Sequence, residues 1–462
     1  MVAATEPLIR VLRQRHLVSA QDLRSALGVS APTLMRLVRG AGEQVLSIGR
    51  ARRSAYAARR PLRGSLEPLP LYRVDRAGRA EHIAQLHLAW PTGTWVDLLR
   101  GADELDWPLA GSSSRMQDGW FEGVPYFLQD MRPQGFLGRQ FARAHAAVLQ
   151  VSDNPEHWSD DDALHALALL GADQSGNFIV GEAAYRLWQD RDETEQAIPE
   201  HEVATAYPEL ARRAMAFGLQ GGSSAGGEFP KFGALHVSDA EPRRVLVKFS
   251  GSDKSPGTRR WSDLLVCEHL AADIVNTLEG LQGARSRVLR AGNRTFLEVE
   301  RFDRHGRRGR SGLCSWAAIN GDWYGLAGGP WTAAGAALRR NRLIDDATQQ
   351  AIARLTYFGQ LIANTDMHDG NLSFQPAGPQ LRVSPVYDML PMAYRPQVGV
   401  ELAEIRFAPR LPLPGDREAW LAAAAAAVRF WETAAHDRRI SADFRRICGR
   451  NAVLVTEARG RA

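Results

Sequence analysis

Residues 361–374 read Leu-Ile-Ala-Asn-Thr-Asp-Met-His-Asp-Gly-Asn-Leu-Ser-Phe, an apolar approach followed by a polar loop. Four residues separate Asp366 from Asn371 in this loop. That spacing is typical of phosphoryl-transfer loops, in which the carboxylate accepts the proton of a substrate hydroxyl and the carboxamide helps to hold Mg²⁺. We therefore expect Asp366 to be the catalytic base and Asn371 to be a metal ligand. His368 is expected to orient Asp366 or the phosphates.

A second acidic residue follows a short strand-like run downstream. Residues 383–390 read Val-Ser-Pro-Val-Tyr-Asp-Met-Leu, so Asp388 occupies the place of the metal-binding aspartate in a D-F-G element. Met389-Leu390 stands where Phe-Gly would be. Mg²⁺ prefers hard oxygen ligands and is commonly held by one or two carboxylates plus substrate phosphates. Asn371 and Asp388 are therefore the expected Mg²⁺ ligands.

Upstream, the distribution of lysine is informative. The chain holds 57 basic residues, of which only those at positions 231, 248 and 254 are lysine. Lys231 closes a glycine-rich run at 221–231, and Lys248 lies near the end of an apolar run at 245–250. A glycine-rich turn followed by a strand that carries lysine is how kinase-like lobes hold the phosphates of ATP. The expected nucleotide-binding residues are Ser224, Gly226, Gly227, Lys231 and Lys248, with Glu268 on the following helix as the partner of Lys248.

These motifs have the order found in the HipA family of bacterial serine/threonine kinases, the toxin half of type II toxin–antitoxin modules. The chain resembles that family over roughly residues 115–440, and its amino-terminal segment makes the YjjJ (HipH)-like branch the best match. Residues 123–135, Gly-Val-Pro-Tyr-Phe-Leu-Gln-Asp-Met-Arg-Pro-Gln-Gly, resemble the family's amino-terminal region. The motifs are S-x-G-x-x-x-P-K at 224–231, V-K-F-S at 247–250, V-E-R-F-D-R at 299–304, N-T-D-x-H-x-x-N at 364–371 and P-x-Y-D-M-L at 385–390.

The resemblance implies an α+β, two-lobed, protein-kinase-like fold that uses ATP and Mg²⁺ to phosphorylate a protein substrate. It also implies that Glu300 and Phe302 belong to the hinge that binds adenine, and that Ser223 or Ser224 is autophosphorylated. A separate antitoxin is a candidate partner. The resemblance does not name the protein substrate.

The amino-terminal segment is strongly basic. Residues 1–64 hold twelve arginines and three acidic residues, a net charge of +9 in a chain whose total is +5. Basic charge concentrated in a small terminal segment is typical of nucleic-acid binding. We expect helices at 8–15, 20–27 and 31–39, with Ser19 and Ser30 as amino-terminal caps and Gly28 as a stop. Strands at 44–48 and 54–57 would form a wing, so the pattern predicts a winged helix-turn-helix domain that contacts DNA through Thr33, Arg36, Arg39, Arg50, Arg52 and Arg53.

The expected domains are a winged helix-turn-helix domain at 1–60, a linker at 61–70, an amino-terminal kinase lobe with a HipA-type subdomain at 71–302, and a mostly helical carboxy-terminal lobe at 303–462. The clearest helices are expected at 263–278, 346–362, 417–435 and 441–455. Cys267, Cys314 and Cys448 are too far apart for a zinc or disulfide framework. No segment suggests a membrane span or a secretory signal, so a cytoplasmic location is expected.

Other functional classes stay open at this point. The kinase-like fold could serve a DNA-binding transcriptional regulator as a sensor scaffold, although Lys248, Asp366, Asn371 and Asp388 are all intact. A small-molecule phosphotransferase would usually place histidine before the catalytic aspartate, whereas His368 follows Asp366. A metal-dependent nuclease would use Asp366, His368 and Asn371 together with the basic amino-terminal segment, but this function would leave the glycine-rich loop at 221–231 unexplained.

Overall fold

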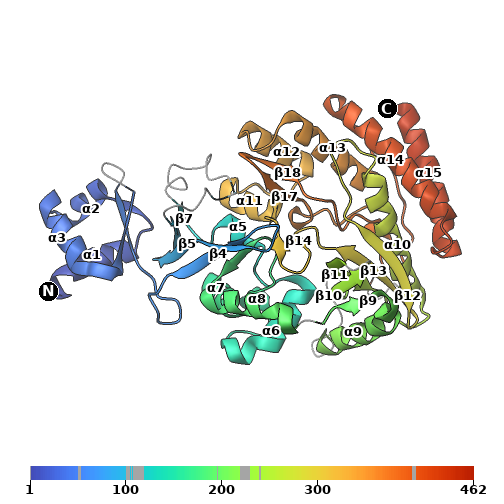
Figure 1. Ribbon diagram of the computed structural model, residues 1–462. Helices are drawn as coiled ribbons and strands as arrows, with labels where there is room; N and C mark the ends of the chain where they lie inside the picture. The colour runs from blue at the N-terminus through green and yellow to red at the C-terminus, as the bar shows by residue number, and fades with distance from the viewer. Residues whose placement is uncertain are drawn as a thin grey trace.

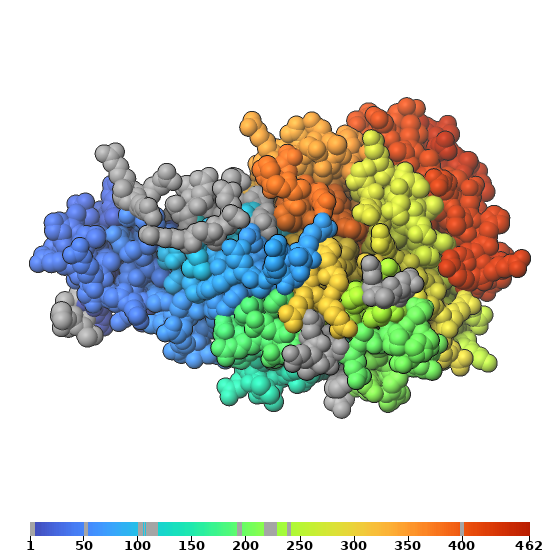
Figure 2. Space-filling model, viewed as in Figure 1, coloured from blue at the N-terminus to red at the C-terminus, as the bar shows by residue number. Residues whose placement is uncertain are grey.

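The computed structural model describes residues 2–49, 54–99, 105, 107, 119–194, 196–218, 229–238, 241–397 and 402–462. Figure 1 shows a small amino-terminal region at one end of a larger body that holds the later elements. In the space-filling view of Figure 2 the amino-terminal residues (blue) form one tip of an elongated surface. Among the described residues, none of the helices has both the length and the apolarity to span a membrane.

The amino-terminal region combines short helices with a small antiparallel sheet of strand order β1–β3–β2. Ser19 Oγ accepts a hydrogen bond from Asp22 N, Ser30 Oγ accepts one from Thr33 N, and Gly28 ends its helix at φ 64°, so the predicted caps are confirmed. The first helix begins at Val2, not at the predicted Leu8. The prediction followed the apolar residues that are buried, such as Leu8 and Leu12, and these begin only in the second half of the helix. The elements are α1 (Val2–Arg13), β1 (Val18–Ser19), α2 (Ala20–Leu27), α3 (Ala31–Ala41), β2 (Val45–Ile48) and β3 (Ala55–Ala58).

The segment expected as a linker, 61–70, is fastened to the body. Leu62 is 8% exposed and belongs to the main core. Arg63 pairs with Asp162 at 2.6 Å, and the neighbouring Arg60 pairs with Asp161. Both aspartates lie in the first turn of α7 (Asp160–Leu170), whose capping box is built by Ser159 and Asp162. The acidic first turn of α7 therefore holds the amino-terminal region to the body.

Next along the chain is a middle unit built on a sheet of order β7–β6–β5–β4–β8 with antiparallel neighbours. Leu86 and Leu88 of its longest strand are buried while Gln85 and His87 are half-buried, the alternation expected of a strand with one face in the core. Its elements are β4 (Leu69–Val74), β5 (Ala80–Ala89), β6 (Gly93–Leu98), β7 (Trp120–Phe121), α5 (Tyr126–Gln129), α6 (Gly135–Leu149), α7, β8 (Phe178–Val180) and α8 (Glu182–Thr194).

A second sheet, of order β12–β13–β11–β10–β9, carries the predicted nucleotide-binding lysines. Val247 and Phe249 of β11 pack in an apolar cluster with Tyr207 of α9, so alternation turns Leu246 and Lys248 to the opposite face. That face meets α10. The elements are β9 (Ile198–Pro199), α9 (Val203–Gly218), β10 (Lys231–Ser238), β11 (Glu241–Phe249), α10 (Pro256–Val275), β12 (Ser286–Ala291) and β13 (Arg294–Glu300).

The start predicted for α10, Asp263, is wrong. The helix begins at Pro256 with Ser255 as its cap, because proline is well tolerated in the first helical turn and its φ already suits a helix. Asp263 is instead buried in mid-helix, where its carboxylate accepts hydrogen bonds from Ser441 N at 2.7 Å and Ser441 Oγ at 2.6 Å. This contact joins α10 to the start of the last helix.

The remaining body is mostly helical. Its last two helices follow the predicted ranges, although the final one continues to Arg461. The small side chains of Ala423 and Ala427 are buried on α14, which packs against α13 and α15. The elements are β14 (Arg304–His305), β15 (Gly309–Arg310), β16 (Cys314–Ser315), α11 (Trp316–Trp323), α12 (Trp331–Arg340), α13 (Asp346–Leu361), β17 (Ser373–Ala377), β18 (Gln380–Val383), α14 (Arg417–His436) and α15 (Ala442–Arg461).

Gly283 lies where the segment before Asp388 meets α10. Val386 N donates to Gln282 O at 2.7 Å, and Ala284 N donates to Val386 O at 2.8 Å. A Cβ at position 283 would overlap the carbonyl of Ala272. Only glycine therefore lets the chain pass this close to the helix.

We expect Gly283→Ala to lower the free energy of unfolding by about 2 kcal/mol, because the backbone must shift to admit the methyl group. Urea denaturation followed by tryptophan fluorescence measures the change. Gly321→Ala is the matched control: Gly321 is exposed in α11 with open space around it, so alanine should be neutral or stabilise by up to ~1 kcal/mol. Equal stability of the two variants would contradict this account of Gly283.

Candidate active site

Lys248 is the centre of the site. It lies on β11, with Lys231 opposite it on β10 and Leu297 opposite it on β13. Its ammonium group is 2.6 Å from Glu268 Oε1 and also contacts Asp388 Oδ1. The Lys248 side chain is 4% exposed and that of Glu268 is 6% exposed. The structure thus brings together a strand lysine, a helix carboxylate and the aspartate after β18, as the sequence pattern predicts.

The charges in this group depend on one another. Burial alone would lower the pKa of Lys248, but Asp388 and Glu268 raise it above its usual value. Burial raises the pKa of Glu268, and the neighbouring Asp388 adds to that rise while Lys248 opposes it. For Asp388, burial is outweighed by Lys248, Lys231 and His368, which hold the pKa of its carboxyl below the usual range. Lys248 is therefore the cation that lets two carboxylates share a buried site.

Asp388 has a strained backbone. Its φ is 54°, in the left-handed region that residues other than glycine rarely adopt. Two hydrogen bonds hold this conformation: Asn364 Nδ2 donates to Asp388 O at 3.4 Å, and Val386 N donates to Gln282 O at 2.7 Å. Tyr387 adds a hydrogen bond from its hydroxyl to Gly370 O at 2.9 Å. Strain of this kind persists where the surroundings over-determine it, and it clusters at functional sites.

The loop that carries Asp366 is braced from within. Asp366 N donates to Asn364 Oδ1 at 3.0 Å, and Asn371 Nδ2 donates to Asp366 O at 2.9 Å. The second bond leaves the amide oxygen of Asn371 as the atom suited to a cation. His368 accepts from Gly370 N at 3.1 Å through Nδ1. Asp366 and His368 are exposed, so a substrate hydroxyl can reach the carboxylate from solvent.

A cavity of about 520 Å³ adjoins Lys248 and Asp388. Val299, Glu300 and Phe302 line it at the end of β13, and the ring centroid of Phe302 lies 5.9 Å from that of Tyr387. Asp388 offers a hard carboxylate oxygen beside the Lys248 ammonium, a combination that suits Mg²⁺ with a phosphate-bearing ligand. Asn371 lies on the loop that Asn364 and Tyr387 join to the Asp388 segment. The middle unit also reaches this cavity through Asp130, Gln134, Leu137 and Phe141.

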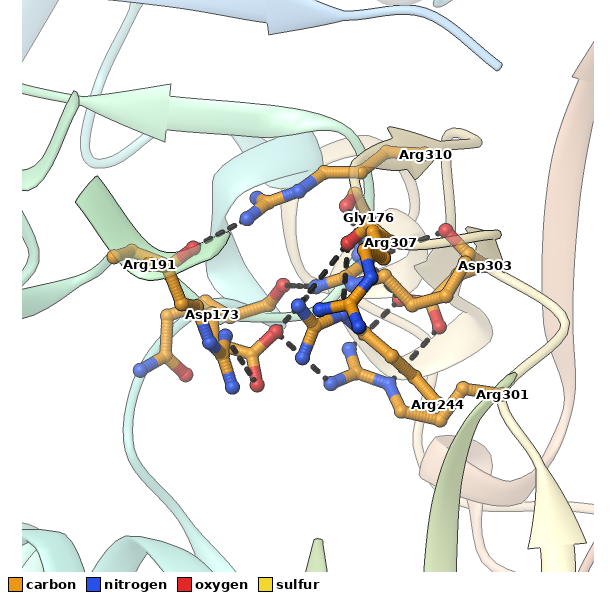
Figure 3. Close-up of polar contacts among 11 residues, drawn as sticks. Asp173, Gly176, Arg191, Arg244, Arg301, Asp303, Arg307 and Arg310 are labelled. Carbon is orange, nitrogen blue, oxygen red and sulfur yellow. Dashed lines mark hydrogen bonds and ion pairs between the residues drawn. The ribbon is translucent and has the colours of Figure 1, made fainter. Parts of the chain in front are cut away.

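An arginine–aspartate cluster joins the middle unit to the predicted hinge (Figure 3). Asp173 pairs with Arg191 at 2.9 Å and with Arg301 at 3.3 Å, and Asp303 pairs with Arg301 at 3.0 Å. Burial alone would raise the pKa of Asp173, but the surrounding arginines hold it far below its usual range. The motif Val-Glu-Arg-Phe-Asp-Arg at 299–304 therefore does two things. It lines the cavity, and its arginines bind Asp173 of the middle unit.

Not every predicted residue falls in the described part of the chain. Ser223, Ser224, Gly226 and Gly227 lie outside it, as do Arg50, Arg52 and Arg53. Of the remaining predicted DNA-contacting residues, Arg36 and Arg39 lie on the exposed face of α3. Thr33 Oγ1 accepts from Arg36 Nη2 at 3.2 Å. The helix that carries them, α3, lies at the end of the molecule away from β11 and α10, which carry Lys248 and Glu268 (Figure 1).

The sequence reasoning overlooked several residues of the site. Leu246 and Tyr387 line the cavity. Leu246 lies two residues before Lys248, and Tyr387 directly precedes Asp388. Alternation along β11 was a usable signal for Leu246, since residues two apart share a face of a strand. Asp130 and Gln134 lie in the 123–135 stretch that resembles the family, but nothing in that stretch or at Leu137 places them in the cavity, because they reach it from a different sheet unit.

Comparison with known proteins identifies two matching family models. A YjjJ-like toxin middle domain matches residues 65–189, and a HipA-like C-terminal domain matches residues 223–450. Toxin YjjJ of Escherichia coli K12 is 39% identical over 433 residues, which cover 93% of both chains. A chain of the Shewanella oneidensis MR-1 HipA, HipB and operator DNA complex has a similar fold, with a TM-score of 0.52 at 15% identity over 85% of this chain and 97% of that one. The Helicobacter pylori proinflammatory kinase CtkA gives a TM-score of 0.36 at 14% identity, over 52% of this chain and 94% of that one.

We expect Lys248→Met to destabilise the fold by about 3 kcal/mol at about pH 8, because it leaves the buried Glu268 and the half-buried Asp388 without their cation. The destabilisation should shrink at about pH 5. Without Lys248 the folded-state pKa of Glu268, already above its usual value, rises further, and that of Asp388 is held down less, so the folded state gains protons and stability as the pH falls.

Urea titrations at the two pH values measure this difference. Lys254→Met is the matched control, since Lys254 is an exposed lysine six residues along the chain. A penalty for Lys248→Met that is the same at both pH values would show that Lys248 does not act by neutralising these carboxylates.

Proposed function

The chain belongs to the HipA family, in the branch of the YjjJ-like toxins, and on this premise we propose that it is an ATP- and Mg²⁺-dependent serine/threonine protein kinase with its own DNA-binding domain. The observation that carries the proposal is the position of Lys248, buried between Glu268 and Asp388 beside a cavity of about 520 Å³. A buried lysine held by a helix carboxylate is the arrangement by which kinases position phosphates.

Each residue of the site has a distinct task in this proposal. Lys248 contacts the phosphates, and Glu268 holds its ammonium in place. Glu300 and Phe302 line the adenine end of the cavity. Asn371 and Asp388 would hold Mg²⁺, which when bound neutralises charge on the phosphates. Asp366 accepts the proton of the serine or threonine hydroxyl, and His368 orients it. Because Lys248 now contacts Asp388, this contact must lengthen when phosphate oxygens take its place.

We further propose that the kinase modifies itself on Ser223 or Ser224 in the loop before Lys231. A phosphate there adds up to two negative charges, which Lys231 and Lys248 would attract. The modified loop would then compete with the phosphates of ATP. The protein substrate and a separate antitoxin would be further partners, in the cytoplasm, where ATP and Mg²⁺ are supplied.

DNA binding is proposed for residues 1–60. Three observations support it: the +9 charge of residues 1–64, the helix pair α2–α3 joined through Gly28, and the exposed position of Arg36 and Arg39 on α3. In a winged helix-turn-helix domain α3 would enter the major groove, and the wing between β2 and β3 would bring Arg50, Arg52 and Arg53 to the phosphates or the minor groove. The Shewanella neighbour named above was solved with HipB and operator DNA.

We expect Asp366→Asn to reduce phosphoryl transfer by at least ~100-fold while leaving stability unchanged, because Asp366 is exposed and acts on the substrate proton. Transfer of radiolabel from ATP to the chain and to lysate proteins, with Mg²⁺, measures the rate. Asp369→Asn is the matched control in the same loop and should stay within a few-fold of the parent.

Undiminished transfer by Asp366→Asn would remove Asp366 as the base. Absence of transfer by the parent chain under all tested conditions would overturn the kinase assignment itself. Phosphopeptide mapping of the same reaction locates the autophosphorylated residue, and label confined to sites outside 221–231 would exclude Ser223 and Ser224.

For DNA, we expect the Arg36→Ala, Arg39→Ala double variant of the full chain to bind duplex DNA more weakly, in mobility-shift titrations, than the parent chain.

Replacing Arg50, Arg52 and Arg53 should flatten the slope of log affinity against log salt by roughly 0.9 for each phosphate that the protein no longer neutralises. Thr33→Ala should alter sequence preference rather than the slope. The Arg459→Ala, Arg461→Ala double variant, which removes as much charge as the Arg36→Ala, Arg39→Ala variant but from the exposed end of the last helix, should change nothing. Mobility-shift titrations at several salt concentrations decide, and unchanged binding by both head variants would refute the proposal.

A further inference from the structure

A second cavity, of about 710 Å³, lies away from the Lys248 group, where the middle unit meets the carboxy-terminal body. The turn between β4 and β5 forms one wall, and β15 and the β17–β18 hairpin form the others. Figure 2 shows the light-blue β4–β5 segment reaching the gold and orange segments there. The charged residues that line this arginine-lined cavity are Arg73, Arg76, Arg79, Arg310 and Arg382, against Asp75 and Glu81.

The carboxylates do not offset all of this positive charge. Glu81 pairs with Arg73 at 2.9 Å, and Asp75 pairs with Arg79 at 2.8 Å. Arg76 and Arg382 hydrogen-bond neutral groups instead. Arg76 Nε donates to His305 Nε2 at 3.3 Å, and Arg382 Nη2 donates to Gln375 Oε1 at 3.0 Å. The lining therefore carries an excess positive charge that an anion would balance.

Two buried polar groups of the lining lack a partner among the described residues. Arg310 is 2% exposed, and while one nitrogen donates to Ala172 O, its Nη1 has no hydrogen-bond partner. Asn177 is 5% exposed and its Oδ1 is likewise without one. Buried polar groups are nearly always satisfied by protein, water or a bound group. Both atoms are closed to solvent, so they lie behind the surface of the cavity and do not contact its open space.

The walls of the cavity are held rigidly. Arg310 N donates to Asp75 O at 2.9 Å, which fixes the β4–β5 turn on β15. A Cβ at Gly309 would overlap the carbonyl oxygen of Arg76, so the two segments touch backbone to backbone. The Arg310 side chain extends toward the cluster of Figure 3, where its Nη2 donates a hydrogen bond to Ala172 O. Preformed cationic walls reduce the ordering cost of binding.

From the excess arginine charge and the fixed position of the walls, we propose that the arginine-lined cavity binds a small phosphate-bearing molecule. Arg76 and Arg382 reach it from opposite walls, and guanidinium groups match phosphate oxygens in geometry. The bound anion would join the middle unit to the β17–β18 hairpin.

This site is separate from the proposed nucleotide site. The two cavities share no lining residue. A third cavity, of about 560 Å³, lies between them, with Arg76 and Arg382 at one side and Glu300 and Phe302 at the other. The inference is independent of kinase activity, since it rests on the charge and geometry of this cavity alone.

Inorganic pyrophosphate is the probe, titrated calorimetrically into the full chain in EDTA so that no Mg²⁺ supports binding near Lys248. We expect one site. Arg76→Gln and Arg382→Gln should each weaken binding by roughly 10-fold, since each removes a charge-assisted contact. Both residues are exposed, so the variants should fold, and circular dichroism verifies this. The distant Arg212→Gln on α9 is the control and should bind like the parent. Lys248→Met tests the nucleotide site and should also bind like the parent, at a pH and temperature where circular dichroism shows that this destabilised variant is folded.

Loss of binding in Lys248→Met with full binding in Arg382→Gln would assign the anion to the nucleotide site and overturn the proposal. So would the absence of binding by the parent chain. Binding of a single-stranded oligonucleotide that depends on Arg76 and Arg382, without binding of pyrophosphate, would replace the small molecule by a nucleic-acid backbone.

Discussion

The buried contact of Lys248 with Glu268 and Asp388 is the constraint around which the body of the protein is arranged. The three residues come from β11, α10 and the segment after β18, which are far apart in the sequence. Two carboxylates cannot remain ionised together in a buried place without a cation between them. The ammonium of Lys248 therefore fixes how the sheet, the helix and the carboxy-terminal lobe meet, and every nearby feature of the site depends on that arrangement.

Much of this site could be predicted because its signals are local. The spacing of Asp366 and Asn371, the lysine that ends an apolar run, and the caps at Ser19 and Ser30 each depend on a few adjacent residues. The family resemblance of these motifs is confirmed by the matches to HipA-like and YjjJ-like proteins. Helix ends were less predictable. Pro256 opens α10, whereas the helix was expected to begin at Asp263.

Contacts between distant units could not be predicted, because no local pattern encodes them. Asp173 of the middle unit neutralises arginines on both sides of Phe302, yet nothing around position 173 distinguishes it from an ordinary surface aspartate. The contribution of Gln134 and Leu137 to the cavity is of the same kind. Residues 61–70 have the composition of a flexible linker, but Leu62 reaches the main core and the neighbouring Arg60 pairs with Asp161.

The scarcity of lysine has a practical consequence for chemical labelling. Amine-reactive reagents find side-chain targets only at Lys231, Lys248 and Lys254. Lys254 is exposed, whereas the Lys248 side chain is 4% exposed and enclosed by carboxylates. Acylation of Lys248 therefore requires its ammonium to leave Glu268 and Asp388 and lose its proton. The ratio of adducts at positions 248 and 254, measured by mass spectrometry, would report how often the contacts of Lys248 with Glu268 and Asp388 open.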